Sequence, residues 1–115
     1  MTIIRKSSTQ RISKVVIHNE TAYLSGQLPE DLNEGIEGQS KSVLSRVDHF
    51  LAEANTDKSK LLYAMIHVKH SKDAQAFNEV WNAWLPENCA PARTCVEANM
   101  VNDDVLVEVT VTAAL

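Results

Sequence analysis

The chain has 115 residues, enough for one domain built around a single hydrophobic core. Its net charge of −4, without a basic stripe, argues against a surface that binds nucleic acid by neutralising phosphates. No segment approaches the run of about 18 apolar residues that a membrane span needs. The first residues also lack the apolar core of a secretory signal, so we expect a cytoplasmic protein without a membrane partner.

Cysteine and histidine spacing gives no sign of a metal site. Cys89 and Cys95 are separated by five residues, which is not a metal-ligand spacing, and no second cysteine pair completes a zinc site. In a cytosolic protein we expect them to be free thiols. The histidines do not group either; His67 and His70 straddle a predicted strand end and are expected at the surface.

The first third of the chain reads as short strands and loops. In order, we predict an edge strand at 2–5, a loop at 6–13, and strands at 14–18 and 21–25. The pair Asn19-Glu20 between the last two strands favours a tight hairpin. Gly26 then indicates a special backbone angle or a close approach, and Pro29 closes the strand.

The middle of the chain alternates helix and strand. Apolar residues recur at helical spacing from Ile36 to Ala54, which predicts an amphipathic helix of about five turns. Residues 61–68 are apolar at nearly every position, which predicts a strand covered on both faces. Side chains of 71–73 are candidate caps for a second helix, which Pro86 terminates.

The last third predicts an antiparallel hairpin of two alternating runs, 92–98 and 105–112. An even loop length places Arg93, Cys95, Glu97 and Glu108 on one face, with Arg93 and Glu108 about 7–13 Å apart along the strands. A small anion fits between such groups. The alternative is an exposed polar face whose ion pairs contribute about 0–1 kcal/mol each.

This order of elements predicts an α+β domain whose two helices cover one face of a mixed sheet. Because two helices can cover only one face, the apolar strand at 61–68 implies that another copy of the chain covers the other. The sequence therefore predicts an oligomer.

The motifs together resemble the RidA (YjgF-type) family of reactive-intermediate imine deaminases, over essentially the whole length. They are Ser-Gly-Gln-Leu-Pro at 25–29, Phe-Asn-x-x-Trp at 77–81, Pro-Ala-Arg-Thr-Cys-Val-Glu at 91–97 and Val-Glu-Val at 107–109. The resemblance implies a single chorismate-mutase-like domain over 1–115, a homotrimer, and ligand sites in clefts between subunits. It also implies hydrolysis of enamine or imine acids, such as 2-aminoacrylate, to 2-oxo acids and ammonia without a cofactor.

The same resemblance implies roles for five residues. Arg93 matches the arginine that binds the substrate carboxylate, and Glu108 matches the glutamate that positions water. Cys95 matches a position whose main chain holds the substrate nitrogen, and Ser25 and Asn78 match other pocket positions. One stretch departs from the pattern: Gln10-Arg11-Ile12-Ser13 stands where better-known members carry Gly-Pro-Tyr with a pocket tyrosine.

Because this tyrosine is missing, the motifs do not decide which substrate is preferred or whether the protein is an enzyme, and two alternatives to a deaminase remain. The first alternative to a deaminase is a non-catalytic trimer that binds small carboxylates such as 2-oxo acids. The second is an endoribonuclease or translation inhibitor, a description that the family has also carried. The acidic charge balance disfavours this last alternative.

Overall fold

The computed structural model describes residues 2–115 and contains a six-stranded sheet with two α-helices. The strands are β1 (Ile4–Ser8), β2 (Ser13–His18), β3 (Thr21–Leu24), β4 (Leu61–Val68), β5 (Ala92–Glu97) and β6 (Val107–Ala114). The helices are α1 (Ile36–Glu53) and α2 (Ala74–Trp84). Short 3-10 turns at Lys58–Lys60 and Ser71–Asp73 precede β4 and α2, respectively. The strand order is β1-β2-β3-β6-β4-β5.

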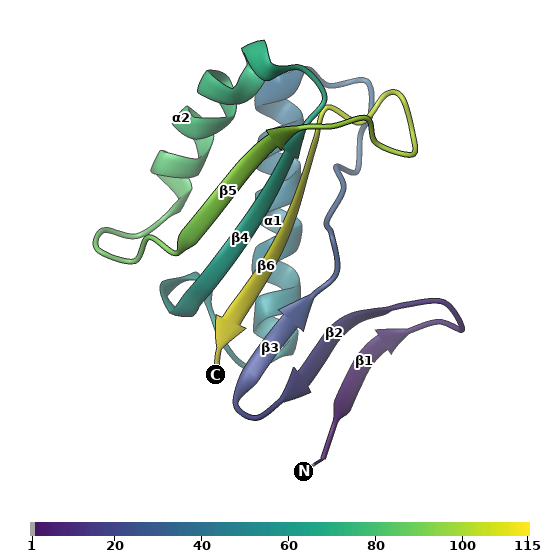
Figure 1. Cartoon of the computed structure of the whole chain (residues 1–115), viewed down its shortest axis with the longest axis vertical. Helices are drawn as coiled ribbons and strands as arrows, with labels where there is room; N and C mark the ends of the chain where they lie inside the picture. The colour runs from purple at the N-terminus through teal and green to yellow at the C-terminus, as the bar shows by residue number, and fades with distance from the viewer. Residues whose placement is uncertain (1) are drawn as a thin grey trace.

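Both helices lie on one face of this mixed sheet, and the other face is open (Figure 1). The predicted fold class is therefore confirmed. In β4, Ala64, Ile66 and Val68 point to the helices and are buried, whereas Leu62 on the open side is 49% exposed. Within one chain, β4 is therefore covered on the helix side only. That another copy of the chain covers its open side stays a prediction.

The predicted hairpin of the last two strands is wrong, because β4 lies between them. β5 pairs with β4 in parallel, and β6 pairs with β4 on its other side in antiparallel fashion. The connection from Ala98 to Leu106 crosses the end of β4, bonding to it through Ala98 N–H to Val68 O (2.9 Å) and Lys69 N–H to Leu106 O (2.9 Å). Alternation shows which side chains share a face of one strand, but it does not identify the neighbouring strand.

The hairpin of β2 and β3 is confirmed. His18 pairs with Thr21, and both residues between them have positive φ, 52° for Asn19 and 60° for Glu20. Two positive φ angles match a turn whose twist agrees with that of the strands. The first strand runs further than predicted, because β1 takes in Lys6 to Ser8 from the expected loop.

Both helices form where the apolar spacing predicts them. α1 turns Val43, Leu44, Val47 and Leu51 into the core, and α2 contributes Phe77 and Trp81. The predicted capping of α2 from its own first residues is not seen, since Asp73 makes no capping hydrogen bond with its side chain. Instead a carboxylate oxygen of Glu97 accepts the Ser71 N–H (2.6 Å) just ahead of the helix, which ties β5 to its start.

Asp57 stabilises the 3-10 turn Lys58–Lys60, and this contribution depends on pH. Its carboxylate accepts hydrogen bonds from the Ser59 hydroxyl and from the Ser59 N–H (2.8 Å), which hold the pKa of Asp57 below its ordinary 3.8. A lowered folded-state pKa gives stability that is present above 3.8 and lost as the pH falls through the lowered value. We expect Asp57→Ala to lower the melting temperature at pH 7 and the difference to shrink in acid. A difference that stays constant from pH 7 to pH 2 would contradict this.

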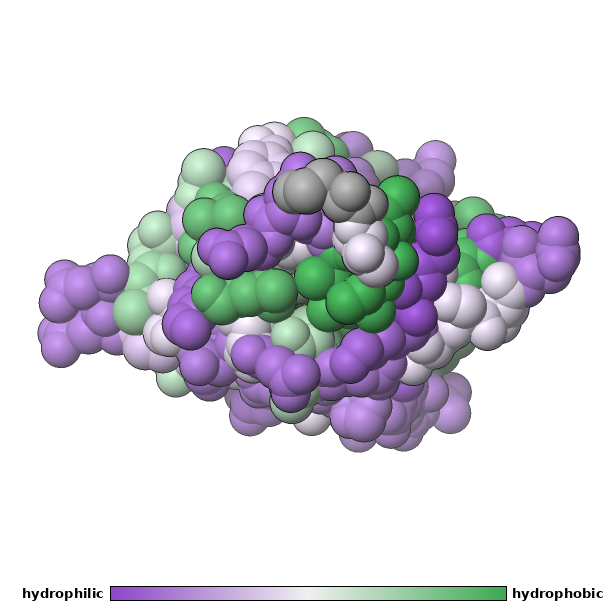
Figure 2. Space-filling view, turned by 90° about the horizontal axis from the view of Figure 1, so that it is seen from below, coloured by the Kyte–Doolittle hydropathy of each residue, from purple (hydrophilic) through white to green (hydrophobic). Residues whose placement is uncertain are grey.

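Apolar side chains remain exposed on the sheet and at one end of the molecule. Figure 2 shows hydrophobic surface beside the N-terminus. The exposed large apolar side chains include Ile3, Ile4, Tyr23, Leu62 and Val96, all between 41% and 49% exposed. Several belong to strands whose other face is buried, which supports the expectation of a partner on the open side of the sheet.

Candidate functional site

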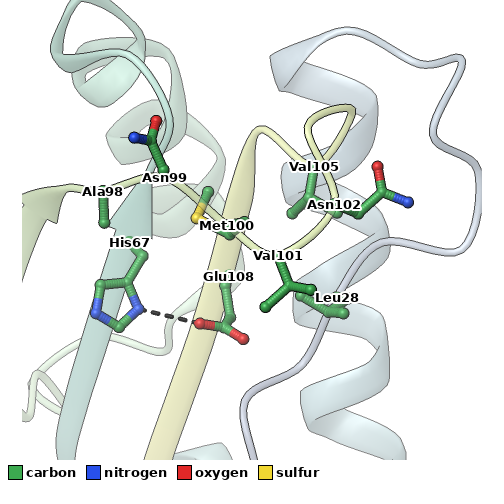
Figure 3. A pocket seen from close by; sticks show the side chains of 9 residues that line it. All are labelled: Leu28, His67, Ala98, Asn99, Met100, Val101, Asn102, Val105 and Glu108. Atoms are coloured by element: carbon green, nitrogen blue, oxygen red, sulfur yellow. Dashed lines mark hydrogen bonds and ion pairs between the residues drawn. The ribbon is translucent and has the colours of Figure 1, made fainter.

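The open face of the sheet carries a paired histidine and glutamate. The register of β4 against β6 sets His67 directly opposite Glu108, so that both side chains leave the same face. His67 Nδ1 lies 3.1 Å from a carboxylate oxygen of Glu108 (Figure 3). Each side chain keeps over a quarter of its surface exposed, 29% for His67 and 28% for Glu108, so water reaches the pair.

This pair lies in a pocket of about 320 Å³. The walls are Leu28, Val105 and the segment from Ala98 to Asn102, which arches over Glu108 (Figure 3). Of the described residues that line it, His67 and Glu108 are the ionisable ones. Apolar walls with few polar groups are typical of sites that bind small molecules.

The arching connection is held from the core side by a buried glutamine. Gln39 on α1 donates through Nε2 to the carbonyl oxygen of Asp104 (3.0 Å) and accepts the Leu106 N–H at Oε1 (2.8 Å). These bonds pair one backbone carbonyl and one backbone N–H on either side of Val105, which lines the pocket. The position of the pocket wall is therefore fixed by the helix layer.

The absence of a side chain at Gly26 leaves space for the Glu108 carboxylate. A Cβ atom at this position would lie 2.7 Å from Glu108 Oε2 and 2.9 Å from its Cδ. The close approach predicted for Gly26 is thus confirmed, whereas a special backbone angle is not, because its φ is not positive. The neighbouring residue Gln27 fixes this approach by exchanging backbone hydrogen bonds with Val109 (2.8 and 3.2 Å).

We expect Gly26→Ala to fold normally and to move the Glu108 carboxylate. The backbone conformation suits alanine, and the atom in the way is the far end of a flexible side chain. A displacement of about 1 Å in a reacting group is enough to lower turnover by roughly 100-fold. Activity measured beside the melting temperature checks this; wild-type activity in a folded Gly26→Ala protein would contradict it.

Arg93 lies in a second polar group, on the helix side of the sheet. Its Nη2 donates to Asn78 Oδ1 on α2 (2.8 Å), and its guanidinium lies 5.3 Å from the centre of the Trp81 ring. The arginine is exposed at the edge strand β5. The structure thus brings together Arg93 and Asn78, two of the residues that the sequence singled out, and holds the guanidinium by this hydrogen bond and by a cation–π contact with Trp81.

Arg93 and Glu108 do not share a face, contrary to the prediction. Arg93 pairs with Ala64 and Glu108 with His67, and these two β4 residues point to opposite sides of the sheet. The two positions lie roughly 10 Å apart along the strands and roughly 10 Å across them. One chain therefore cannot bring both groups to the same small ligand.

The remaining predicted residues lie outside the pocket. Cys95 is half-buried on the helix side, against the core, and is a free thiol, as is Cys89. Ser25 is half-buried next to Gly26, and its hydroxyl accepts from Gln27 Nε2 (3.3 Å). Arg11 and Ile12, from the stretch that replaces the expected tyrosine, are exposed in the turn between β1 and β2 and do not line the pocket.

His67 is the site residue that the sequence reasoning missed. It was expected at the surface, yet it is half-buried and bonded to Glu108. Its position in the strand 61–68 was predicted correctly, but its partner follows only from the β4–β6 register. In the described part of the chain, no cluster of three metal-ligating side chains is present, and no helix there is long and apolar enough to cross a bilayer.

Comparisons with known proteins agree on one group. The model of the family described as endoribonuclease L-PSP matches residues 3–115. A RutC family protein of Haemophilus ducreyi is 39% identical over 113 residues, which cover 98% of this chain and 97% of the relative. The 3-aminoacrylate deaminase RutC of Acinetobacter baylyi is 31% identical over 93 residues, covering 76% of this chain and 73% of the relative.

Solved structures show the same architecture. A member of the YjgF protein family from Neisseria meningitidis has a TM-score of 0.96 to this structure and is 37% identical. The match covers 99% of this chain and 95% of that one. Sheet order, helix placement and length are therefore shared across the whole domain.

Proposed function

The chain belongs to the endoribonuclease L-PSP family, which includes the RutC and YjgF proteins, and from this premise we propose that it hydrolyses small enamine or imine acids. The products are a 2-oxo acid and ammonia. The observation that carries the proposal is Glu108, a half-exposed carboxylate held in place inside a pocket of small-molecule size. A relative named for deamination of 3-aminoacrylate supports this class of substrate.

The reaction needs one anchored carboxylate and one directed water. Glu108 takes a proton from water as the water oxygen bonds to the imine carbon, and the electron pair of the C=N bond moves to nitrogen, which takes up a proton. In the adduct the hydroxyl proton then passes to the amino nitrogen as the C–N bond breaks, so that ammonia leaves with the electron pair of that bond and the carbonyl forms. Arg93 binds the substrate carboxylate with two parallel hydrogen bonds.

The complete site lies between subunits in this proposal. Arg93 is exposed on one side of the sheet edge and Glu108 on the open face, so a second copy has to supply one of them. The half-exposed apolar side chains on the open face, such as Leu62, are the surface that this copy would cover. A homotrimer, as in the resemblance, gives three equivalent clefts. Asn78 orients Arg93 within its own chain.

The direct test is to generate 2-aminoacrylate in the presence of the purified protein and to follow ammonia and pyruvate. We expect faster pyruvate formation than in buffer. Equal rates with and without protein would refute the deaminase proposal.

Mixing two inactive variants tests the location of the site. If Arg93 and Glu108 act from different chains, unfolding and refolding Arg93→Ala together with Glu108→Gln restores sites that hold both native residues. Random assembly restores about one quarter of the sites, because each native residue is present with a chance of roughly one half. Sites contained in a single chain would give no recovery at all.

A second candidate is a non-catalytic protein that binds small carboxylates, and the stretch Gln10-Arg11-Ile12-Ser13 favours it. No tyrosine is available there to line the pocket. Titration with a 2-oxo acid, followed by calorimetry, separates the candidates when combined with the assay. Binding without turnover supports this second function, whereas turnover supports the first.

A further inference from the structure

The contribution of His67 to folding stability is too small to account for its place beside Glu108. A pair whose partners are both over a quarter exposed is screened by water, and such pairs contribute about 0–1 kcal/mol. The residue also brings a polar ring into a pocket whose other walls are largely apolar. Its position directly opposite Glu108 on the neighbouring strand suggests a role exerted through that carboxylate.

We propose that His67 is the positioning residue for Glu108, fixing the carboxylate in the orientation that aims water at the substrate; the catalytic part of this inference rests on the proposed function. A carboxylate only accepts hydrogen bonds, so the imidazole must donate from Nδ1 to Oε1. The neutral ring therefore carries its proton on Nδ1, and its Nε2 points away from Glu108 (Figure 3).

The second carboxylate oxygen is restrained by shape. Glu108 Oε2 lies beside Gly26, in space that a side chain there would take. Oε1 is bonded to His67, and Oε2 occupies the space beside Gly26 that a side chain would take, so each carboxylate oxygen has a defined place. A reacting group held in this way does not have to be ordered again at each turnover.

The tautomer of His67 provides a test that does not need activity. In protein labelled with nitrogen-15 in histidine, NMR of the ring nitrogens is expected to show the neutral His67 protonated at Nδ1. In Glu108→Ala this preference should be lost, because the acceptor is gone. A His67 ring that carries its proton on Nε2 and none on Nδ1 in the wild-type protein would overturn the proposal, whatever the result of the deaminase assay.

Kinetics test the positioning itself. We expect His67→Phe, which keeps the ring and removes the donor, to lower kcat by about 10- to 100-fold while KM changes by less than about twofold. His67→Asn, whose amide N–H stands near the place of Nδ1, should recover most of the loss. His70→Phe, at an exposed histidine outside the pocket, is the matched control.

Three outcomes separate the inferences. A wild-type protein without deaminase activity refutes the proposed function, and the NMR result then decides whether His67 fixes Glu108. An active protein in which His67→Phe keeps the wild-type kcat refutes positioning by His67. A His67→Phe protein with the wild-type melting temperature and a reduced kcat, together with a kcat that His67→Asn restores, supports positioning by His67. A purely structural role would lower the melting temperature and kcat together.

Discussion

Replacing Glu108 by glutamine is expected to reduce kcat by about 10²- to 10⁴-fold, the range typical of losing a positioned proton acceptor. Glutamine has the shape of glutamate, and its carbonyl oxygen can still accept from His67 Nδ1, so the pocket should keep its form. What is lost is the carboxylate that takes the proton of the attacking water. Steady-state release of ammonia from 2-aminoacrylate measures the effect.

The matched control for this variant is Glu79→Gln, an exposed residue of α2 that lies away from the pocket. It removes the same charge and should leave kcat unchanged. If Glu108→Gln retained more than about half of the wild-type kcat, the role of Glu108 as base would have to be abandoned. A binding measurement with a 2-oxo acid should show little change in either variant, because neither removes the carboxylate anchor.

Replacing Arg93 by alanine is expected to weaken binding of the substrate carboxylate by roughly 2–5 kcal/mol, which lowers kcat/KM by about 30- to 5,000-fold. The change removes both parallel hydrogen bonds and the charge, and it leaves Asn78 without its donor. Arg93→Lys should recover only part of the loss, since an ammonium group keeps the charge but not the planar fork. The deaminase assay measures the change in kcat/KM, and calorimetry with a 2-oxo acid measures the change in carboxylate binding.

Arg46→Ala is the control for loss of an arginine. Arg46 forms an ion pair with Glu30 (3.3 Å) in which the glutamate is largely exposed, so we expect an effect on stability of about 1 kcal/mol or less and none on binding. Under both proposed functions Arg93→Ala loses carboxylate binding. Retained binding in that variant would show that the anion is held elsewhere.

Local structure followed well from the residues alone. The spacing of apolar side chains predicted α1 and α2, because a helix with one buried face needs that period. The apolar run at 61–68 predicted β4, and Asn19-Glu20 predicted the turn between β2 and β3. Gly26 was correctly expected at a close approach. The helices, the strand and the turn depend on neighbours in sequence, which is why the pattern was sufficient for them; the glycine at 26 indicated a close approach but not that Glu108 makes it.

The membership in a family was also determined by the sequence, through short motifs spread over its length. The run Pro-Ala-Arg-Thr-Cys-Val-Glu at 91–97 in its place before the last strand was the most specific of them. Such motifs identify the family, and the comparisons confirm the resemblance. The motifs do not carry the distances between their residues.

Only the tertiary structure decided which residues meet. The strand order placed β4 between β5 and β6, and this insertion put Arg93 on the helix side and Glu108 on the open face beside His67. Alternation within a strand is a local property, whereas strand neighbours are chosen by how the whole chain buries its most apolar strand. The pairing of His67 with Glu108 follows from that choice and from no shorter stretch of the sequence.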